Sequence, residues 1–339
     1  MSKTTKIIIA IVVIVFTLLG VFTYKVGSEE ELSENTTEQT SDNTKSNNDN
    51  KKGYTTTAQN QASTTEEEDP YKELDELIGL EEVKREVHDL ADFIKVQKMR
   101  EAQGLKVPKM SYHLVFTGSP GTGKTTVARI VARIYKDLGI LKKGHTVETD
   151  RSGLVGEYLG ETAIKTNAII DSALYGVLFI DEAYALVPEE SGRDYGQEAI
   201  STLLKRMEDD RDRLVVIVAG YTDEMKKFIN SNPGLQSRFN RYIDFPDYTA
   251  DELAQIYLLH VKKNQYTMDE ATIEYLKERF EYVVAHKDRN FGNGRYARNV
   301  FEKSIQSQAK RVSKVENPTT EMLTIITKQD LENGFAAMK

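Results

Sequence analysis

The sequence predicts an α/β fold, a parallel sheet surrounded by helices, followed by a helical C-terminal part. Three observations carry this prediction. A complete phosphate-binding loop pattern lies between an apolar strand and a helix. Further short apolar segments alternate with helical ones up to Pro246, and the pattern is helical beyond it. Strands that alternate with helices are typical of parallel sheets, which are buried on both faces.

The phosphate-binding loop matches the pattern G-x-x-x-x-G-K-[ST] in full. Its residues, with the one that follows, are Gly118, Ser119, Pro120, Gly121, Thr122, Gly123, Lys124, Thr125 and Thr126. Leu114–Phe116 before it is apolar like a buried strand, and 127–132 after it is helical in pattern. Glycines allow backbone amides to close around a phosphate. We expect Lys124 to contact the β- and γ-phosphates and the Thr125 hydroxyl to bind Mg²⁺.

A second motif consists of the apolar segment Gly176–Ile180 and the two acidic residues that directly follow it, Asp181 and Glu182. The carboxyl ends of parallel strands lie along one edge of the sheet, where the phosphate loop also lies. We therefore expect Asp181 to hold Mg²⁺ through water, and Glu182 to polarise the water that attacks a phosphate. Another apolar strand, Leu214–Ala219, ends at the same edge.

Composition limits the other function classes. The formal net charge of −8 and the pI near 5.4 argue against a nucleic-acid partner, which requires a basic surface. The absence of cysteine excludes disulfides, thiolate zinc sites and a thiol nucleophile. The five histidines show no metal-ligand spacing, so we interpret them as structural or surface residues.

Residues 1–26 are predicted to form an N-terminal transmembrane anchor. Ile7–Tyr24 is almost unbroken apolar sequence, and its eighteen residues would span about 27 Å as a helix, close to a bilayer's hydrocarbon core. A cleavable signal peptide is the alternative, but the apolar stretch is long and no clear small-x-small site follows it. Lys3 and Lys6 favour an exported C-terminal part. The need for ATP favours a cytoplasmic one, so we expect a single-pass membrane protein with a cytoplasmic main domain.

Residues 27–69 are predicted to be a disordered acidic linker, because eleven acidic residues and three lysines leave too few apolar side chains to offset the entropy of ordering. Residues 70–246 are expected to form the α/β domain, which starts with an amphipathic helix through about residue 100. Residues 247–339 are expected to form a helical domain, opened by a capping box at Thr249–Glu252.

Together these segments resemble the AAA+ ATPases and, more closely, the CbxX/CfqX family, which includes the stage V sporulation protein K group and red-type Rubisco activases. The resemblance covers residues 70–339 and depends on the order of the motifs as well as their content. The residues that carry it are His113–Gly118, Asp150, Arg151, Leu154–Thr162, Gly176–Tyr184, Ala219–Tyr221, Asn232–Phe239 and Phe245–Tyr248. It implies an AAA+ P-loop fold with a C-terminal helical lid, and it does not extend to the anchor or the linker.

The resemblance also implies a ring, usually a hexamer, that binds ATP with Mg²⁺ between subunits. Arg238 matches the family's arginine finger, which would reach the γ-phosphate held by the neighbouring subunit. Tyr158, Leu159 and Gly160 match the aromatic pore loop that grips a polypeptide in the central channel.

Further nucleotide contacts follow from the resemblance. Ile78–Gly79 matches the adenine contact. Arg295 and Arg298 both lie where the lid's sensor arginine belongs, and the sequence does not choose between them. The sensor residue after the fourth strand is commonly Asn in the wider AAA+ pattern. Here Tyr221 or Thr222 would orient the water.

The expected function is that of a membrane-tethered AAA+ ATPase, which hydrolyses ATP to ADP and phosphate and remodels or threads a protein substrate through an oligomeric ring. The expected partners are further copies of the chain, an unidentified protein substrate and the membrane, but no nucleic acid. The alternative is an assembly scaffold in sporulation or secretion, whose output is nucleotide-dependent ring formation without threading. Rubisco remodelling, sporulation and secretion all stay open as pathways.

Overall fold

The computed structural model describes residues 69–338 except 109, 159 and 188–194. The predicted anchor Ile7–Tyr24 and the predicted linker up to residue 68 lie outside the described residues. Within the described part, no helix is both long enough and apolar enough to cross a membrane. The longest, α3 (Glu81–Ala102) and α12 (Asn293–Val312), carry charged side chains along their length. The prediction of a single-pass membrane protein is thus not borne out by any helix of the described residues.

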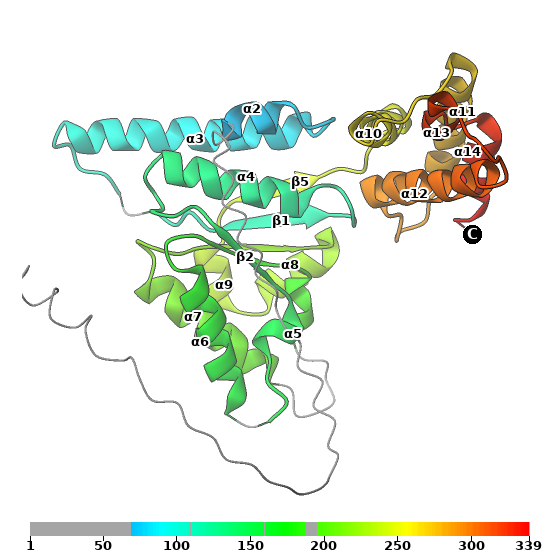
Figure 1. Ribbon diagram of the computed structural model, residues 1–339. Helices are drawn as coiled ribbons and strands as arrows, with labels where there is room; N and C mark the ends of the chain where they lie inside the picture. The colour runs from blue at the N-terminus through cyan, green and yellow to red at the C-terminus, as the bar shows by residue number, and fades with distance from the viewer. Residues whose placement is uncertain (1–68, 109, 159, 188–194, 339) are drawn as a thin grey trace, which may run out of the picture. The chain divides into compact units, whose positions relative to one another are not determined.

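The α/β part is built on a parallel sheet with the strand order β2-β3-β4-β1-β5 (Figure 1). The strands are β1 (Leu114–Gly118), β2 (Thr146–Thr149), β3 (Val177–Ile180), β4 (Val215–Gly220) and β5 (Tyr242–Phe245). β1 pairs with both β4 and β5, so Val115 lies opposite Val218 on one side and Tyr242 on the other. The phosphate loop after β1 and the two carboxylates after β3 therefore flank the end of β4.

Helices cover both faces of the sheet (Figure 1). Besides α3 they are α2 (Pro70–Asp75), α4 (Lys124–Asp137), α5 (Arg151–Leu154), α6 (Glu161–Ala173), α7 (Gly196–Asp209), α8 (Thr222–Asn230) and α9 (Pro233–Arg238), with a 3₁₀ turn η1 at Ala183–Leu186. Side chains alternate along a strand, so the sheet has two cores. Phe116 and Phe179 share one core with α3 and α4, whereas Val115 and Leu178 share the other with α6, α7 and α8.

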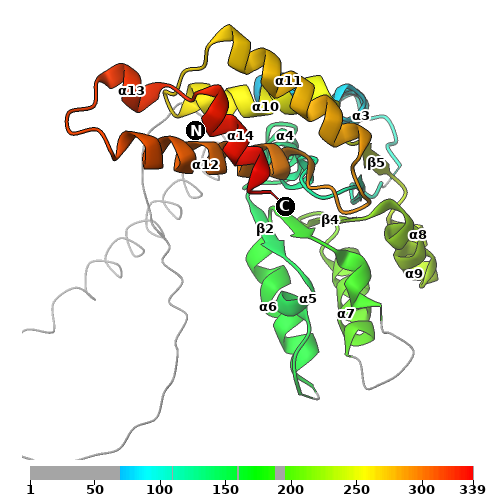
Figure 2. The same ribbon diagram turned by 90° about the vertical axis from the view of Figure 1, so that its right-hand side faces the viewer.

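The C-terminal lid is helical, as predicted (Figure 2). Its helices are α10 (Ala250–Lys263), α11 (Glu270–Ala285), α12, α13 (Thr320–Thr324) and α14 (Lys328–Ala336). The predicted capping box of Thr249 and Glu252 opens α10. The lid core is aromatic, since the ring centroid of Phe280 lies 5.4 Å from that of Phe335 and 6.5 Å from that of Tyr257. The predicted parallel sheet and helical lid are confirmed.

Candidate functional site

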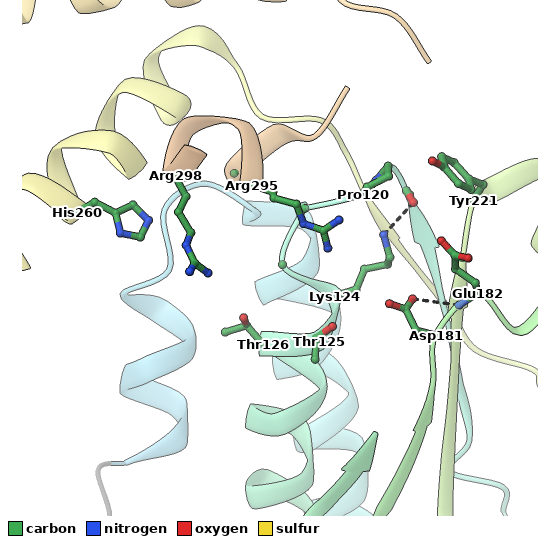
Figure 3. A pocket seen from close by; sticks show the side chains of 15 residues that line it. Pro120, Lys124, Thr125, Thr126, Asp181, Glu182, Tyr221, His260, Arg295 and Arg298 are labelled. Atoms are coloured by element: carbon green, nitrogen blue, oxygen red, sulfur yellow. Dashed lines mark hydrogen bonds between the residues drawn. The ribbon is translucent and has the colours of Figure 1, made fainter. Parts of the chain in front are cut away.

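A cavity of about 310 Å³ lies between the carboxyl ends of β1, β3 and β4 and the lid (Figure 3). The predicted site residues that line it are Gly118, Pro120, Gly121, Gly123, Lys124, Thr125, Thr126, Asp181, Glu182, Tyr221, Arg295 and Arg298. Gly220, His260 and Gly294 complete the lining. The phosphate loop, the two strand-end carboxylates and the lid arginines thus meet in one cavity.

The phosphate loop needs its glycines. A Cβ at Gly118 would lie 2.2 Å from the carbonyl oxygen of Phe245, and one at Gly121 would lie 2.1 Å from that of Gly292. The φ angles of Gly118 and Gly121 are +140° and +72°, a region that side chains disfavour. Because α4 begins at Lys124, the unpaired amides and the positive dipole end of the helix face the cavity.

Two loop residues support the loop without lining the cavity. The Thr122 side chain is fully buried, and its hydroxyl donates to the Ser119 carbonyl at 2.9 Å. Ser119 lines a smaller adjoining cavity that also includes Tyr221 and Thr222. These contacts hold the shape of the loop rather than offering donors to a ligand in the main cavity.

Lys124 is only 9% exposed. Its ammonium donates to the carbonyls of Gly118 at 2.9 Å and Ser119 at 2.7 Å. Burial lowers the pKa of Lys124, and the nearby Asp181 carboxylate opposes that shift. A buried cation held by neutral carbonyls suits an anionic ligand, because hydrogen bonds between charged groups are the stronger ones.

Asp181 and Glu182 follow β3, where Glu182 turns the chain with a φ of +49°. The Glu182 amide donates to the Asp181 carboxylate at 3.1 Å, and both side chains lie beside Lys124 (Figure 3). The Thr125 hydroxyl and the Asp181 carboxylate line the same cavity and are oxygen donors of the kind Mg²⁺ prefers. Within the described residues no group of three or more acidic or histidine side chains could hold a metal alone. A Mg²⁺ ion would therefore share these two ligands with phosphate oxygens and water.

The lid contributes a cationic wall. Arg295 and Arg298 of α12 both line the cavity, with Arg295 between Arg298 and Lys124 (Figure 3). His260 of α10 lies beside Arg298, and its ring stacks on Phe301 with 5.7 Å between centroids. Burial, aided by Arg298, lowers the pKa of His260, so the imidazole is neutral near pH 7. His260, predicted to be a structural or surface residue, instead lines the cavity, which no motif indicates for a lone histidine on a helix.

The two sensor candidates lie differently. Tyr221 lines the main cavity at the end of β4, whereas Thr222 begins α8 and lines the adjoining cavity but not the main one. The Tyr221 ring lies 6.3 Å from the ring of Tyr184, two residues beyond Glu182. Burial, with a contribution from Glu182, raises the pKa of Tyr184 to about 12, so this phenol stays protonated.

Other predicted residues do not line the cavity. Ile78 and Gly79 lie between α2 and α3, where a Cβ at Gly79 would meet the Glu252 carboxylate of the lid at 2.2 Å. Tyr158 lies before α6 and is 68% exposed. Gly160, with a φ of +85°, precedes that helix. Leu159 lies outside the described residues.

Arg238 ends α9, just before β5. Its backbone carbonyl accepts a hydrogen bond at 2.8 Å from the hydroxyl of Ser111, which precedes β1. Arg238 therefore lies at the edge of the sheet where the strands begin, opposite the edge that carries the phosphate loop.

The sequence matches the AAA family, described as the ATPase family associated with various cellular activities, over residues 114–247, and the AAA lid domain over residues 249–339. Stage V sporulation protein K of Bacillus subtilis (strain 168) is 44% identical over 264 residues, which cover 77% of this chain and 81% of that protein. The plasmid form of protein CbxX from Cupriavidus necator is 45% identical over 258 residues, which cover 76% of this chain and 81% of CbxX.

A longer relative matches over part of its length. The ESX-3 secretion system protein EccA3 of Mycobacterium tuberculosis (strain ATCC 25618 / H37Rv) is 45% identical over 275 residues, which cover 76% of this chain but 44% of EccA3. The chain thus spans less than half of that relative. Among solved structures, the FIGL-1 AAA domain in complex with ADP superimposes with a TM-score of 0.56 over 78% of this chain and 83% of that one. At 17% identity this likeness concerns the fold alone.

Proposed function

The chain belongs to the CbxX-type AAA+ ATPases, and we propose that it binds ATP with Mg²⁺ and hydrolyses it to ADP and phosphate. One observation carries the proposal: Lys124, Thr125, Asp181 and Glu182 line one cavity between the sheet and the lid. A buried ammonium, a metal-binding hydroxyl and two carboxylates are the side chains that phosphoryl transfer to water requires.

The α/β part, residues 70–246, would act as the large ATPase subdomain, and residues 247–339 as its lid. The loop amides and the N-terminal end of α4 would bind the phosphates. Lys124 would exchange its bonds to the loop carbonyls for bonds to the β- and γ-phosphate oxygens. Thr125 and Asp181 would hold Mg²⁺, which supplies positive charge at the phosphates. Arg295, the lid arginine nearer Lys124, would be the sensor arginine.

Glu182 would orient the attacking water and accept its proton, since its carboxylate lies beside Lys124 at the phosphate end of the cavity. Tyr221 is the better candidate to position that water, because it lines the cavity and Thr222 does not. Arg298 and His260 lie farther from the phosphate loop and would face the nucleoside.

Arg238 would act on the site of a neighbouring copy in a ring. It lies at the opposite edge of the sheet from its own phosphate loop, so it cannot serve its own site. In a ring in which one face of each chain meets the opposite face of the next, Arg238 of one chain would meet the phosphate loop of its neighbour at every interface. A hexamer is the arrangement expected for this family.

The output of hydrolysis would be remodelling of a protein substrate. Tyr158 is exposed and Gly160, with its positive φ, lies two residues further on, which suits a surface turn that presents an aromatic ring to a passing polypeptide. Relatives are named for sporulation and for secretion, so a nucleotide-dependent assembly scaffold is the second candidate. In both candidates the partner of the ATPase would be a protein.

The substitution Glu182→Gln in the full chain tests the proposal. We expect ATP turnover to fall by at least about a hundredfold while ATP binding is retained, because only the proton acceptor is lost. Lys124→Ala serves as the contrast, since it should lose binding as well. ATP hydrolysis by Glu182→Gln at the wild-type rate would remove Glu182 from the mechanism, and wild-type protein that binds no ATP would remove the function itself.

A further inference from the structure

The lid touches the outer side of the phosphate loop directly. At the start of α12, the amide of Gly294 donates to the carbonyl of Gly121 at 3.0 Å. The side-chain amide of Asn293 donates to the carbonyl of Pro120 at 3.4 Å. When loop amides point inward to a phosphate, neighbouring carbonyls are free to point outward, and these two carbonyls are the ones the lid binds.

Asn293 is the centre of this contact. Its side chain is fully buried, and its φ of +47° is one that asparagine tolerates better than most residues. Its Nδ2 also donates to the Asp247 carboxylate at 2.9 Å and to the Phe291 carbonyl at 3.2 Å, and its Oδ1 accepts from the Tyr248 amide at 3.0 Å. One side chain thus joins the phosphate loop, the segment between β5 and the lid, and the lid itself.

The segment between sheet and lid is held by charge as well. Asp247 accepts a hydrogen bond from Lys287 at 2.5 Å in addition to the one from Asn293. Burial works to raise the pKa of Asp247, but hydrogen bonds from Lys287, Ser119 and Asn293 outweigh it and lower the pKa. Asp247 is therefore an anion near pH 7, and its donors come from the lid and from the phosphate loop.

The packing around Asn293 leaves little room for the loop to move alone. A Cβ at Gly121 would come within 2.1 Å of the Gly292 carbonyl and 3.0 Å of the Arg295 amide. A change in the loop must therefore either displace the start of α12 or leave buried donors and acceptors unpaired, which is the costly alternative.

We propose that Asn293 is a positioning residue that transmits the shape of the phosphate loop to the lid. The inference rests on the proposed nucleotide site. When the loop closes around phosphates, the outward carbonyls of Pro120 and Gly121 shift, and Asn293 and Gly294 carry α12 with them. Because Arg295 follows on the same turn of α12, this movement also sets where its guanidinium enters the cavity. Asn293 itself is not among the residues that line the cavity.

The test uses full-length Glu182→Gln chain as the parent, so that ATP stays bound, and measures hydrogen exchange with and without ATP. In the parent we expect ATP to slow exchange in α4 and in α10 and α12. The variant Asn293→Gly accepts the positive φ and removes the side chain. We expect the variant to keep the slowing of exchange by ATP in α4. In α10 and α12 the slowing should be at least about fivefold smaller than in the parent, which is the low end of the coupling measured between two sites.

Asn290→Gly is the matched control, because Asn290 lies on the same lid turn but is exposed, and it should behave like the parent. Asn293→Asp keeps the size and the acceptor for Tyr248 but removes the donor to Pro120 and sets a carboxylate against Asp247, so it should lose the lid effect at least as fully as the glycine variant. A purely structural role would raise lid exchange with and without ATP equally and leave their difference intact.

Unchanged ATP protection of the lid in Asn293→Gly, with α4 protected, would overturn the inference while leaving the proposed function standing. A parent that binds no ATP would overturn both. With Glu182 intact, we expect Asn293→Gly to lower kcat more than it raises KM, since the loop can still bind the phosphates.

Discussion

The guanidinium of Arg238 lies 3.6 Å from the Glu208 carboxylate of its own chain, at the edge of the sheet where the strands begin. Its Nε is buried and has no hydrogen-bond partner among the residues that the structure describes. A strand of five residues, about 17 Å long, separates this edge from the phosphate loop. Arg238 is therefore held against its own chain at the edge of the sheet opposite its own phosphate loop.

Replacing Arg238 by Ala should lower kcat for ATP by about a thousandfold with little change in ATP binding, because an arginine finger acts on transition-state charge. Arg211→Ala is the control, since Arg211 pairs with the same Glu208 carboxylate at 3.0 Å. Steady-state ATPase assays of both variants provide the measurement. Equal rates for the two variants would argue against the finger, as would full activity of Arg238→Lys, which lacks the planar fork.

His260 should contribute to nucleotide binding rather than to chemistry. We expect His260→Ala to raise KM for ATP about tenfold and to leave kcat within about twofold, because a contact made equally in the ground and transition states affects binding alone. His286→Ala, at the exposed end of α11, is the control. A drop in kcat at constant KM would instead place His260 in the hydrolytic step.

A substitution at Tyr158 distinguishes an ATPase that remodels a protein substrate from an assembly scaffold. If the ring threads a protein substrate, Tyr158→Ala should abolish processing of that substrate and leave basal ATPase activity within about twofold, because Tyr158 is exposed and does not line the nucleotide cavity. Tyr282→Ala, a change at a lid tyrosine that is 54% exposed, controls for loss of surface aromatics. Cellular function that survives Tyr158→Ala would favour the scaffold.

Acid should weaken the fold through His113. This histidine is 4% exposed, its Nδ1 accepts from the Val216 amide at 3.0 Å, and burial lowers its pKa from 6.5 to about 4. Between these values the unfolded chain binds a proton that the folded chain refuses, so the free energy of unfolding falls as pH drops from 6.5 to 4. At 1.4 kcal/mol per pKa unit, His113 contributes about 3 kcal/mol of this loss.

Denaturant unfolding across that pH range checks the prediction. In His113→Asn the amide oxygen can replace Nδ1 as acceptor for Val216 without titrating. Between pH 6.5 and 4 we expect the unfolding free energy of this variant to fall by about 3 kcal/mol less than that of the wild type. Parallel curves for the two proteins would assign the acid sensitivity to other groups.

Local motifs made most of the site predictable. Lys124, Asp181 and Glu182 each follow a strand that the apolar pattern marks, and parallel strands place their carboxyl ends along one edge. The direction of the sheet therefore brings together residues far apart in the sequence. The grouping of these strand-end residues depends on strand direction alone and not on side-chain packing, so it could be predicted from the sequence.

The contacts of the lid could not be predicted in this way. Asn293 and His260 meet the phosphate loop and the cavity only because of how the lid helices pack, and neither lies in a recognisable motif. The adenine contact predicted for Ile78–Gly79 stays a prediction, and the close approach of the Glu252 carboxylate to Gly79 belongs to no sequence motif either. The choice between Tyr221 and Thr222 likewise depended on where α8 begins, a boundary that sequence patterns place only within a few residues.

The position of Arg238 opposite its own phosphate loop has a genetic consequence. Each nucleotide site would be built from two chains, one that supplies the phosphate loop and one that supplies Arg238. A chain without Lys124 could still supply Arg238, and a chain without Arg238 could still supply an intact phosphate loop. Two inactive alleles expressed in one cell could then complement each other, with about a quarter of the interfaces intact when equal amounts mix at random in a closed ring. A single allele carrying both changes would complement neither.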